Sequence, residues 1–173
     1  MFGVQQSPVP ATSLLKTYRD GSNPAAWEQF SDCFTTTVDR PVALDEFVYA
    51  FYTSPVFKLE RAILRLVKLP STDTEALAVA QGTGHTFAAW RVGQRTGTQL
   101  LMCDVMGRTR SWFAVTPSGT PGQSGTLLQF GSGIVATIDA GTGQRRQSLG
   151  FRLLGGFHIV YSQVLLGAAK ARL

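Results

Sequence analysis

TFAAWRVGQRTGTQLLMCDVMGRTRSWFAVTPSGTPGQSGTLLQFGSGIVATID, residues 86–139, is the stretch that decides the fold. Runs of β-branched, aromatic and other apolar residues alternate in it with glycine-containing turns, which is typical of strands. The runs are 86–92, 98–105, 109–116 and 126–139. Consecutive strands joined by short turns favour an antiparallel sheet. The last run is long for one strand, and Gly131 and Gly133 predict a bulge or bend in it.

Upstream of this meander, CFTTTV at residues 33–38 predicts a first strand, and residues 43–69 then carry apolar side chains at helical spacing. Pro55 divides that segment into two helices, the second capped by Ser54. Periodicity predicts that the second helix turns its apolar residues inward and its Lys and Arg residues outward. The apolar residues are Leu59, Ile63, Leu66 and Val67, and the basic ones are Lys58, Arg61, Arg65 and Lys68.

The most apolar stretch, LGFRLLGGFHIVYSQVLLGAA from Leu149, predicts a long C-terminal helix from about Gly150 to Ala171. Helices placed before and after a run of strands favour the α+β class over a doubly wound α/β fold. The 173 residues suit one domain, predicted at residues 14–173, preceded by a flexible proline-containing arm at residues 1–13.

Composition excludes several classes of protein. Hydrophobic residues make up 44% of the chain, which excludes wholesale disorder. The two cysteines and two histidines lack the spacing of a metal site, and the glycine motifs lack the strand–helix context of a nucleotide loop, so we expect neither metal nor cofactor. There is no secretory signal and no clean apolar run of about 18 residues, so the sequence predicts no transmembrane segment and a cytoplasmic location.

The net charge of +5 is unevenly distributed. Residues 1–75 hold seven bases and nine acids, whereas residues 76–173 hold nine bases and two acids. A basic half suits nucleic acid, an anionic membrane surface or an acidic ligand. The bases are scattered singly apart from Arg145-Arg146, which disfavours nucleic acid.

The order of elements resembles the START-like, or helix-grip, superfamily, which includes the birch-pollen-allergen and polyketide-cyclase-like (SRPBCC) proteins. Two stretches are similar to an uncharacterised bacterial branch of it: ALDEFVYAFYTSPVFKLERAILRL at residues 43–66 and FRLLGGFHIVYSQVLLGAA at residues 151–169. The resemblance implies a curved antiparallel sheet wrapped around the C-terminal helix, with two short helices after the first strand. It also implies binding of a small apolar or amphipathic molecule between sheet and helix. A minority of the superfamily are cyclases, dehydratases or hydrolases, and no catalytic residue carries over.

His158 and Tyr161 lie three residues apart and share one face of the C-terminal helix. On the sheet side they would be polar groups above a cavity, and His158 could bind a carboxylate or move a proton. The competing interpretation is a core histidine bonded to a backbone carbonyl. Asp104 near Arg108 and Arg110 is either an acid/base group with anion-binding arginines or a member of a cross-strand ion pair.

Trp90, Met102, Trp112 and Phe130 lie on four successive predicted strands. They suit an adaptable apolar pocket, with Arg110 beside Trp112, and they equally suit a filled core. The register that would decide this is not fixed by the sequence.

Three functional hypotheses follow. The first is a small-molecule binder that holds an apolar or amphipathic ligand, which in one form of the hypothesis carries an acidic group. The ligand-binding candidates are Trp90, Met102, Asp104, Arg110, Trp112, His158 and Tyr161. The second is a cyclase or lyase that uses His158 or Asp104 for proton transfer. The third is a non-enzymatic module that binds a protein or nucleic acid. A homodimer is compatible with all three.

Overall fold

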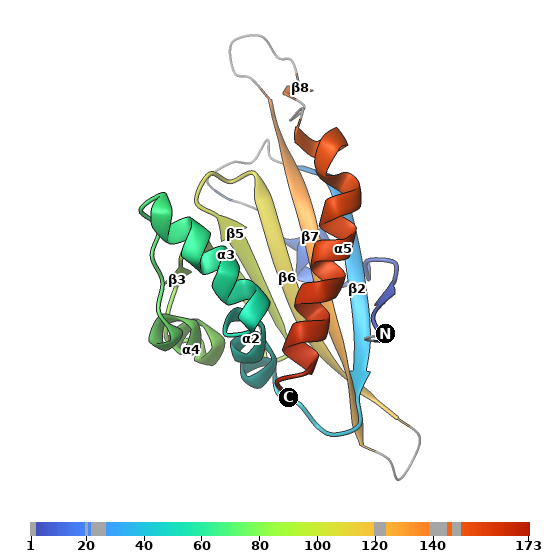
Figure 1. Cartoon of the computed structure of the whole chain (residues 1–173). Helices are drawn as coiled ribbons and strands as arrows, with labels where there is room; N and C mark the ends of the chain where they lie inside the picture. The colour runs from blue at the N-terminus through green and yellow to red at the C-terminus, as the bar shows by residue number, and fades with distance from the viewer. Residues whose placement is uncertain (1–2, 20, 22–26, 120–123, 139–144, 147–149) are drawn as a thin grey trace.

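A curved antiparallel sheet organises the computed structural model, which describes residues 3–19, 21, 27–119, 124–138, 145–146 and 150–173 (Figure 1). The strands are β1 (Gln5–Gln6), β2 (Trp27–Val38), β3 (Thr86–Phe87), β4 (Trp90–Arg95), β5 (Gln99–Asp104), β6 (Thr109–Ser118) and β7 (Gly125–Ile138). Their spatial order is β1-β2-β7-β6-β5-β4-β3, and β8 (Arg145–Arg146) pairs with the end of β7. The predicted α+β class with an antiparallel sheet and a C-terminal helix is confirmed.

The helices are α1 (Leu14–Thr17), α2 (Leu44–Tyr52), α3 (Pro55–Leu66), α4 (Asp73–Gln81) and α5 (Gly150–Lys170). Helices α2 and α5 lie on one face of the sheet, here called the inner face (Figure 1). Ser54 caps α3 by accepting the N–H of Phe57 at 3.2 Å, with Pro55 in the first turn, as predicted. Thr72 and Glu75 begin α4 with a capping box. None of the helices, as far as the chain is described, is long and apolar enough to cross a membrane.

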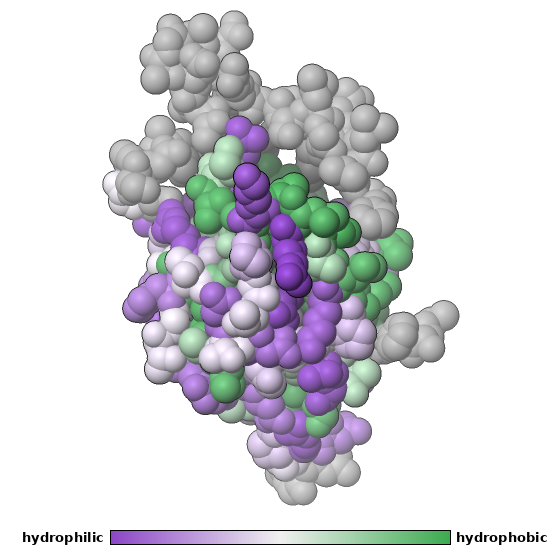
Figure 2. Space-filling view, turned by 60° about the vertical axis from the view of Figure 1, so that its left-hand side comes forward, coloured by the Kyte–Doolittle hydropathy of each residue, from purple (hydrophilic) through white to green (hydrophobic). Residues whose placement is uncertain are grey.

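For helix α3, the prediction is wrong for the apolar residues, whereas Lys58, Arg65 and Lys68 are exposed as predicted. Of its residues only Phe57 is fully buried, while the four apolar residues expected inside are exposed by 58 to 83%. They are Leu59, Ile63, Leu66 and Val67. Figure 2 shows apolar groups beside hydrophilic side chains on the face that carries α3 and α4. Arg61 is the base that departs from the prediction: its side chain is only 10% exposed because it bonds to Asp73 and Ser71.

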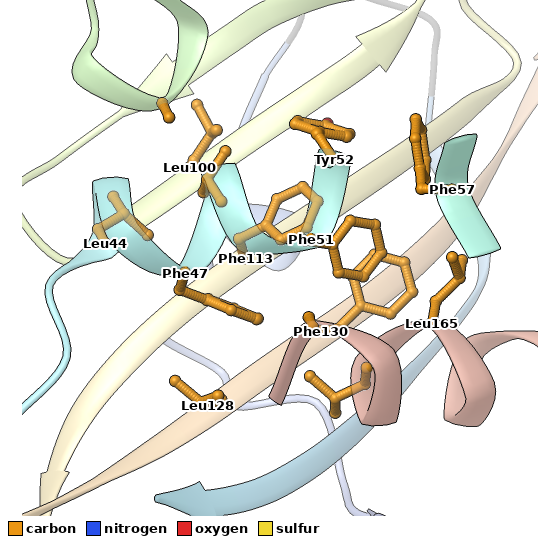
Figure 3. Close-up of a cluster of buried hydrophobic side chains, with 14 of the residues drawn as sticks. Leu44, Phe47, Phe51, Tyr52, Phe57, Leu100, Phe113, Leu128, Phe130 and Leu165 are labelled. Atoms are coloured by element: carbon orange, nitrogen blue, oxygen red, sulfur yellow. The ribbon is translucent and has the colours of Figure 1, made fainter. Parts of the chain in front are cut away.

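The inner face carries the main core, which is aromatic (Figure 3). Phe51 of α2 lies with its ring centroid 4.8 Å from that of Phe113 on β6 and 4.7 Å from that of Phe130 on β7. Rings in such offset and edge contacts add about 0.5 to 1.5 kcal/mol per pair to their burial. Leu165 and Leu166 of α5 close the same cluster. This part of the space between sheet and helices is filled by side chains.

The predicted arm begins as the edge strand β1 and then continues, with Val9 and α1, onto the opposite, outer face of the sheet. Gln5 and Gln6 pair with β2, and the Ser7 hydroxyl bonds to that of Thr35 at 2.9 Å. The chain then enters α1, whose Leu14 and Leu15 are buried. The arm and α1 thereby cover a second, smaller core, formed by Leu14, Leu15, Cys33, Leu101, Cys103, Trp112 and Ala114.

The bulge predicted at Gly131 and Gly133 is wrong. Strand β7 pairs without interruption with β6, and its one irregularity with β2 lies between Glu28 and Phe30. The glycines instead make room for the outer layer, because a Cβ at Gly133 would lie 2.8 Å from Leu15 and one at Gly131 would lie 2.9 Å from the Trp112 ring.

Candidate functional site

Two neighbouring rows of cross-strand pairs divide the inner face into an apolar and a more polar part. One row runs through Phe34, Phe130, Phe113 and Leu100 and is the aromatic core. The next runs through Asp32, Ser132, Ser111, Met102 and Val92. Cross-strand partners project from the same face, so Asp32 and two serines share a row that α5 crosses.

His158 of α5 meets Asp32 of β2 across this row. The His158 Nε2 atom lies 3.2 Å from Asp32 Oδ2, within ion-pairing distance but outside hydrogen-bond angles. The Asp32 side chain is 2% exposed and that of His158 is 37% exposed. The backbone N–H of Ser132 donates to Asp32 Oδ1 at 3.2 Å. A buried carboxylate thus faces a histidine that solvent can reach, which is a geometry suited to proton transfer.

Tyr161, one turn further along α5, donates a hydrogen bond to Glu60 of α3. Burial raises the pKa of Glu60 above its ordinary value, and the bond from Tyr161 partly opposes that shift. Burial and the neighbouring Glu60 raise the pKa of Tyr161 as well. The pair therefore links α3 to α5 through a carboxyl group that holds its proton more tightly than an exposed glutamate does.

Two further buried hydroxyls, on α2 and α5, have no hydrogen-bond partner among the described residues. Tyr52 is 2% exposed and Ser162 is 1% exposed. Burial, followed by the charge of Glu60, raises the pKa of Tyr52, whose ring packs against those of Phe57 and Phe87 at 4.9 and 4.6 Å between centroids. Ser162 follows Tyr161 and lies one helical turn beyond His158. A buried hydroxyl without a partner costs about 1 to 3 kcal/mol, so a hydrogen bond to either group would stabilise the protein.

These groups come from β2, from the consecutive helices α2 and α3, and from α5. We call them the polar cluster, and its members are Asp32, Tyr52, Glu60, His158, Tyr161 and Ser162. Its carboxyl, imidazole and hydroxyl groups can orient a hydrogen-bonding ligand or exchange a proton with it.

The structure brings only some of the predicted site residues to this face. His158 and Tyr161 belong to the polar cluster, Met102 is buried in its sheet row, and Trp90 packs against Phe57 at 5.8 Å between ring centroids. Asp104 pairs across the sheet with Trp90, but its carboxylate accepts the backbone N–H groups of Arg108 and Thr109 at 2.6 and 2.9 Å. Asp104 therefore stabilises the β5–β6 hairpin turn.

Arg110 and Trp112 lie on the outer face, away from the polar cluster. The Arg110 guanidinium stacks over the Tyr18 ring at 5.0 Å, and the Trp112 indole N–H donates to Gln99 at 2.8 Å. Gln99 also accepts the N–H of Leu14. These residues fix the arm and α1 on the sheet. A shallow, open depression beside the arm is lined by Gln6, Ser7, Pro8, Val9, Ser31 and Asp32.

Sequence reasoning missed four members of the polar cluster: Asp32, Tyr52, Glu60 and Ser162. For two of these residues the sequence contained an indication of their position. Asp32 lies two residues before Phe34 in an alternating strand, so the two side chains share one face of that strand. Glu60 is the single acid among the bases of residues 55–68. The sequence contains no such indication for Tyr52 and Ser162, because their lack of hydrogen-bond partners depends on the tertiary structure.

No group of three or more His, Cys, Asp or Glu side chains within the described part of the chain could hold a metal ion. None of the family models, curated proteins or solved structures compared with this chain matches it.

Proposed function

We propose that this protein binds a small amphipathic molecule between α5 and the sheet, with the ligand's hydrogen-bonding end at the polar cluster. The observation that carries the proposal is the pair of buried, unpartnered hydroxyls on Tyr52 and Ser162. The neighbouring row offers Met102 and two serines for the rest of the ligand. The helix-grip architecture implied by the sequence resemblance fits this arrangement, because α2 and α3 follow β2 and α5 crosses the sheet.

The charges of the polar cluster narrow the class of ligand. The cluster contains two carboxyl groups, and Arg110, the arginine expected to recognise an acid, lies on the outer face. The carboxylate of Asp32 would repel an anionic ligand end. We therefore favour a neutral hydrogen-bonding end, such as a hydroxyl or a carbonyl group, on an apolar body.

A panel of medium-chain alcohols, methyl ketones and fatty acids tests binding through the thermal midpoint. We expect alcohols or ketones to raise the midpoint of the native protein and to raise that of Tyr52→Phe and Ser162→Ala less, since each variant removes one hydrogen-bonding group. Tyr49→Phe, the same change on the same helix, is the control and should respond like the native chain. If no member of the panel shifts the midpoint, the proposal is overturned.

A second candidate function rests on the 3.2 Å approach of His158 to Asp32. We propose that this pair performs proton transfer to and from carbon in a lyase- or cyclase-type reaction. His158 would accept the proton from a C–H next to a carbonyl group, and Asp32 would stabilise the resulting imidazolium.

The probe for this activity is 2-undecanone in deuterated water, with deuterium incorporation followed by proton NMR. We expect the native protein to accelerate exchange next to the carbonyl, and His158→Gln and Asp32→Asn to lose the acceleration by roughly a hundredfold or more. Exchange that is equal in the native chain and His158→Gln would remove the enzymatic candidate and leave binding in place.

A further inference from the structure

The outward side of α3 is an apolar stripe that neither the sheet nor another described helix covers. Leu66 is 83% exposed, Leu59 66%, Val67 63% and Ile63 58%. Their spacing of four, three and one residues places them on one side of the helix. Soluble monomers rarely expose contiguous apolar patches of this kind without a binding role.

Helix α5 adds apolar residues next to this stripe. Val160 is 59% exposed and Val164 is 37% exposed, and they flank Tyr161, whose hydroxyl holds Glu60 of α3. The bond joins the two helices side by side, and both lie on the same side of the sheet (Figure 1). We call the exposed apolar residues of α3, together with Val160 and Val164, the apolar surface.

Positive charge accompanies the apolar surface at the end of α3. Lys58 and Arg61 are held by Asp73 at 2.9 and 2.6 Å. Arg65 and Lys68 have no acidic partner within 4.0 Å among the residues that the structure describes. Both are exposed, so their charge is available to a partner.

We propose that the apolar surface docks onto an anionic lipid bilayer, with α3 lying in the plane of the interface. A helix with an exposed apolar stripe and flanking Lys and Arg residues binds such a surface by burying the stripe and pairing its cations with headgroups. This inference is independent of the ligand site, because it uses the outward side of α3, whereas Glu60 points inward.

The charges beside the apolar surface favour a bilayer over a second copy of the chain as the occupant of that surface. A symmetric dimer brings the same surface of each copy together, so the unpaired charges of Arg65 and Lys68 would occur twice in one interface. Like charges at an interface disfavour that arrangement, whereas anionic headgroups neutralise them. The bilayer is therefore the occupant that the observed charges favour.

Flotation of the full chain with vesicles tests the proposal. We expect the protein to float with vesicles of equal parts phosphatidylglycerol and phosphatidylcholine, to float less at high salt, and to remain below vesicles of phosphatidylcholine alone. Leu66→Ser should weaken the partition coefficient about tenfold or more, since it removes the most exposed leucine of the stripe. Arg65→Gln and Lys68→Gln should each weaken it by roughly fivefold.

Matched variants control for general effects of each substitution. Leu77→Ser changes a leucine on α4 that is 39% exposed, and Arg108→Gln with Arg172→Gln removes two exposed charges elsewhere. Both controls should float like the native protein, and thermal melts of all variants verify folding. The proposal is overturned if anionic vesicles fail to float the chain, or if Leu66→Ser floats like Leu77→Ser. It is equally overturned if sedimentation shows a dimer that Leu66→Ser dissociates, which would assign the surface to a second copy.

Discussion

Glu60 carries an ionisable carboxyl group in a buried position. It lies on a helix with three basic residues, yet it points inward, where burial raises its pKa and Tyr161 donates to it. Because the folded state holds this proton more tightly than the unfolded state does, folding is coupled to protonation of Glu60.

The consequence is a specific dependence of stability on pH. Between the ordinary glutamate pKa and the raised folded value, the native state binds more protons, so the free energy of unfolding decreases as pH rises through that window. The variant Glu60→Gln should show a weaker dependence of the free energy of unfolding on pH in this window and should be more stable than the native protein at neutral pH. The Gln side chain can still accept the hydrogen bond from the Tyr161 hydroxyl. Chemical denaturation across pH measures this. Glu75→Gln, at an exposed glutamate, is the control and should keep the native slope, and a Glu60→Gln profile parallel to the native one contradicts the prediction.

At the scale of elements, the end of α3 shows how a local conformation fixes the position of a charge. Lys68 has φ of +63°, in the left-handed region that favours glycine, directly after the helix. The N–H of Leu69 bonds back to the carbonyl of Leu64 at 3.0 Å, as in a glycine-terminated helix. A lysine here keeps a cation at the negative end of the helix dipole at the expense of backbone strain.

Lys68→Gly should therefore raise the free energy of unfolding by about 0.5 to 1 kcal/mol, because glycine adopts this conformation without strain. Arg65→Gly, within the last turn of the same helix, should lower it by about 1 kcal/mol. Urea titration of both variants measures these two changes in the free energy of unfolding. A destabilised Lys68→Gly would show that the charge outweighs the strain. The same variant should weaken vesicle binding, since it removes a cation.

At the scale of the whole molecule, the sheet separates two cores that differ in their dependence on the chain terminus. The inner core is held by α2 and α5, whereas the outer core is covered by the arm and α1. Cys33 and Cys103 are buried in the outer core, and burial raises the pKa of the Cys33 thiol to about 11. A thiol of that kind reacts slowly until its cover opens.

The variant Leu15→Ala tests whether the outer core opens independently of the inner core. It should cost about 2 to 5 kcal/mol of stability, because Leu15 is 1% exposed and fits against Gly131 and Gly133. It should also accelerate modification of the two cysteines by a thiol reagent at denaturant concentrations below the unfolding transition. Leu44→Ala, a comparable loss in the inner core, should allow labelling only in step with global unfolding. Equal labelling in both variants would mean that the two cores open together.

Local sequence determined the main strands of this protein and helices α2, α3 and α5, whereas β1, α1 and α4 were not predicted. The Ser54–Pro55 helix start, the C-terminal helix over residues 150–170 and the succession of strands follow from capping chemistry and periodicity, which act over a few neighbouring residues. These signals were sufficient for the α+β class.

Tertiary structure alone decided which side of each element faces which partner. Leu100, Leu101, Met102 and Cys103 are all buried, because both faces of the sheet are covered, so alternation could not place Met102 inside and Trp112 outside. Long-range contacts likewise turned the apolar stripe of α3 to solvent and brought Asp32 to His158. The physical reason is that periodicity specifies two sides of a helix or strand, whereas the free energy of the whole chain selects the side that is buried.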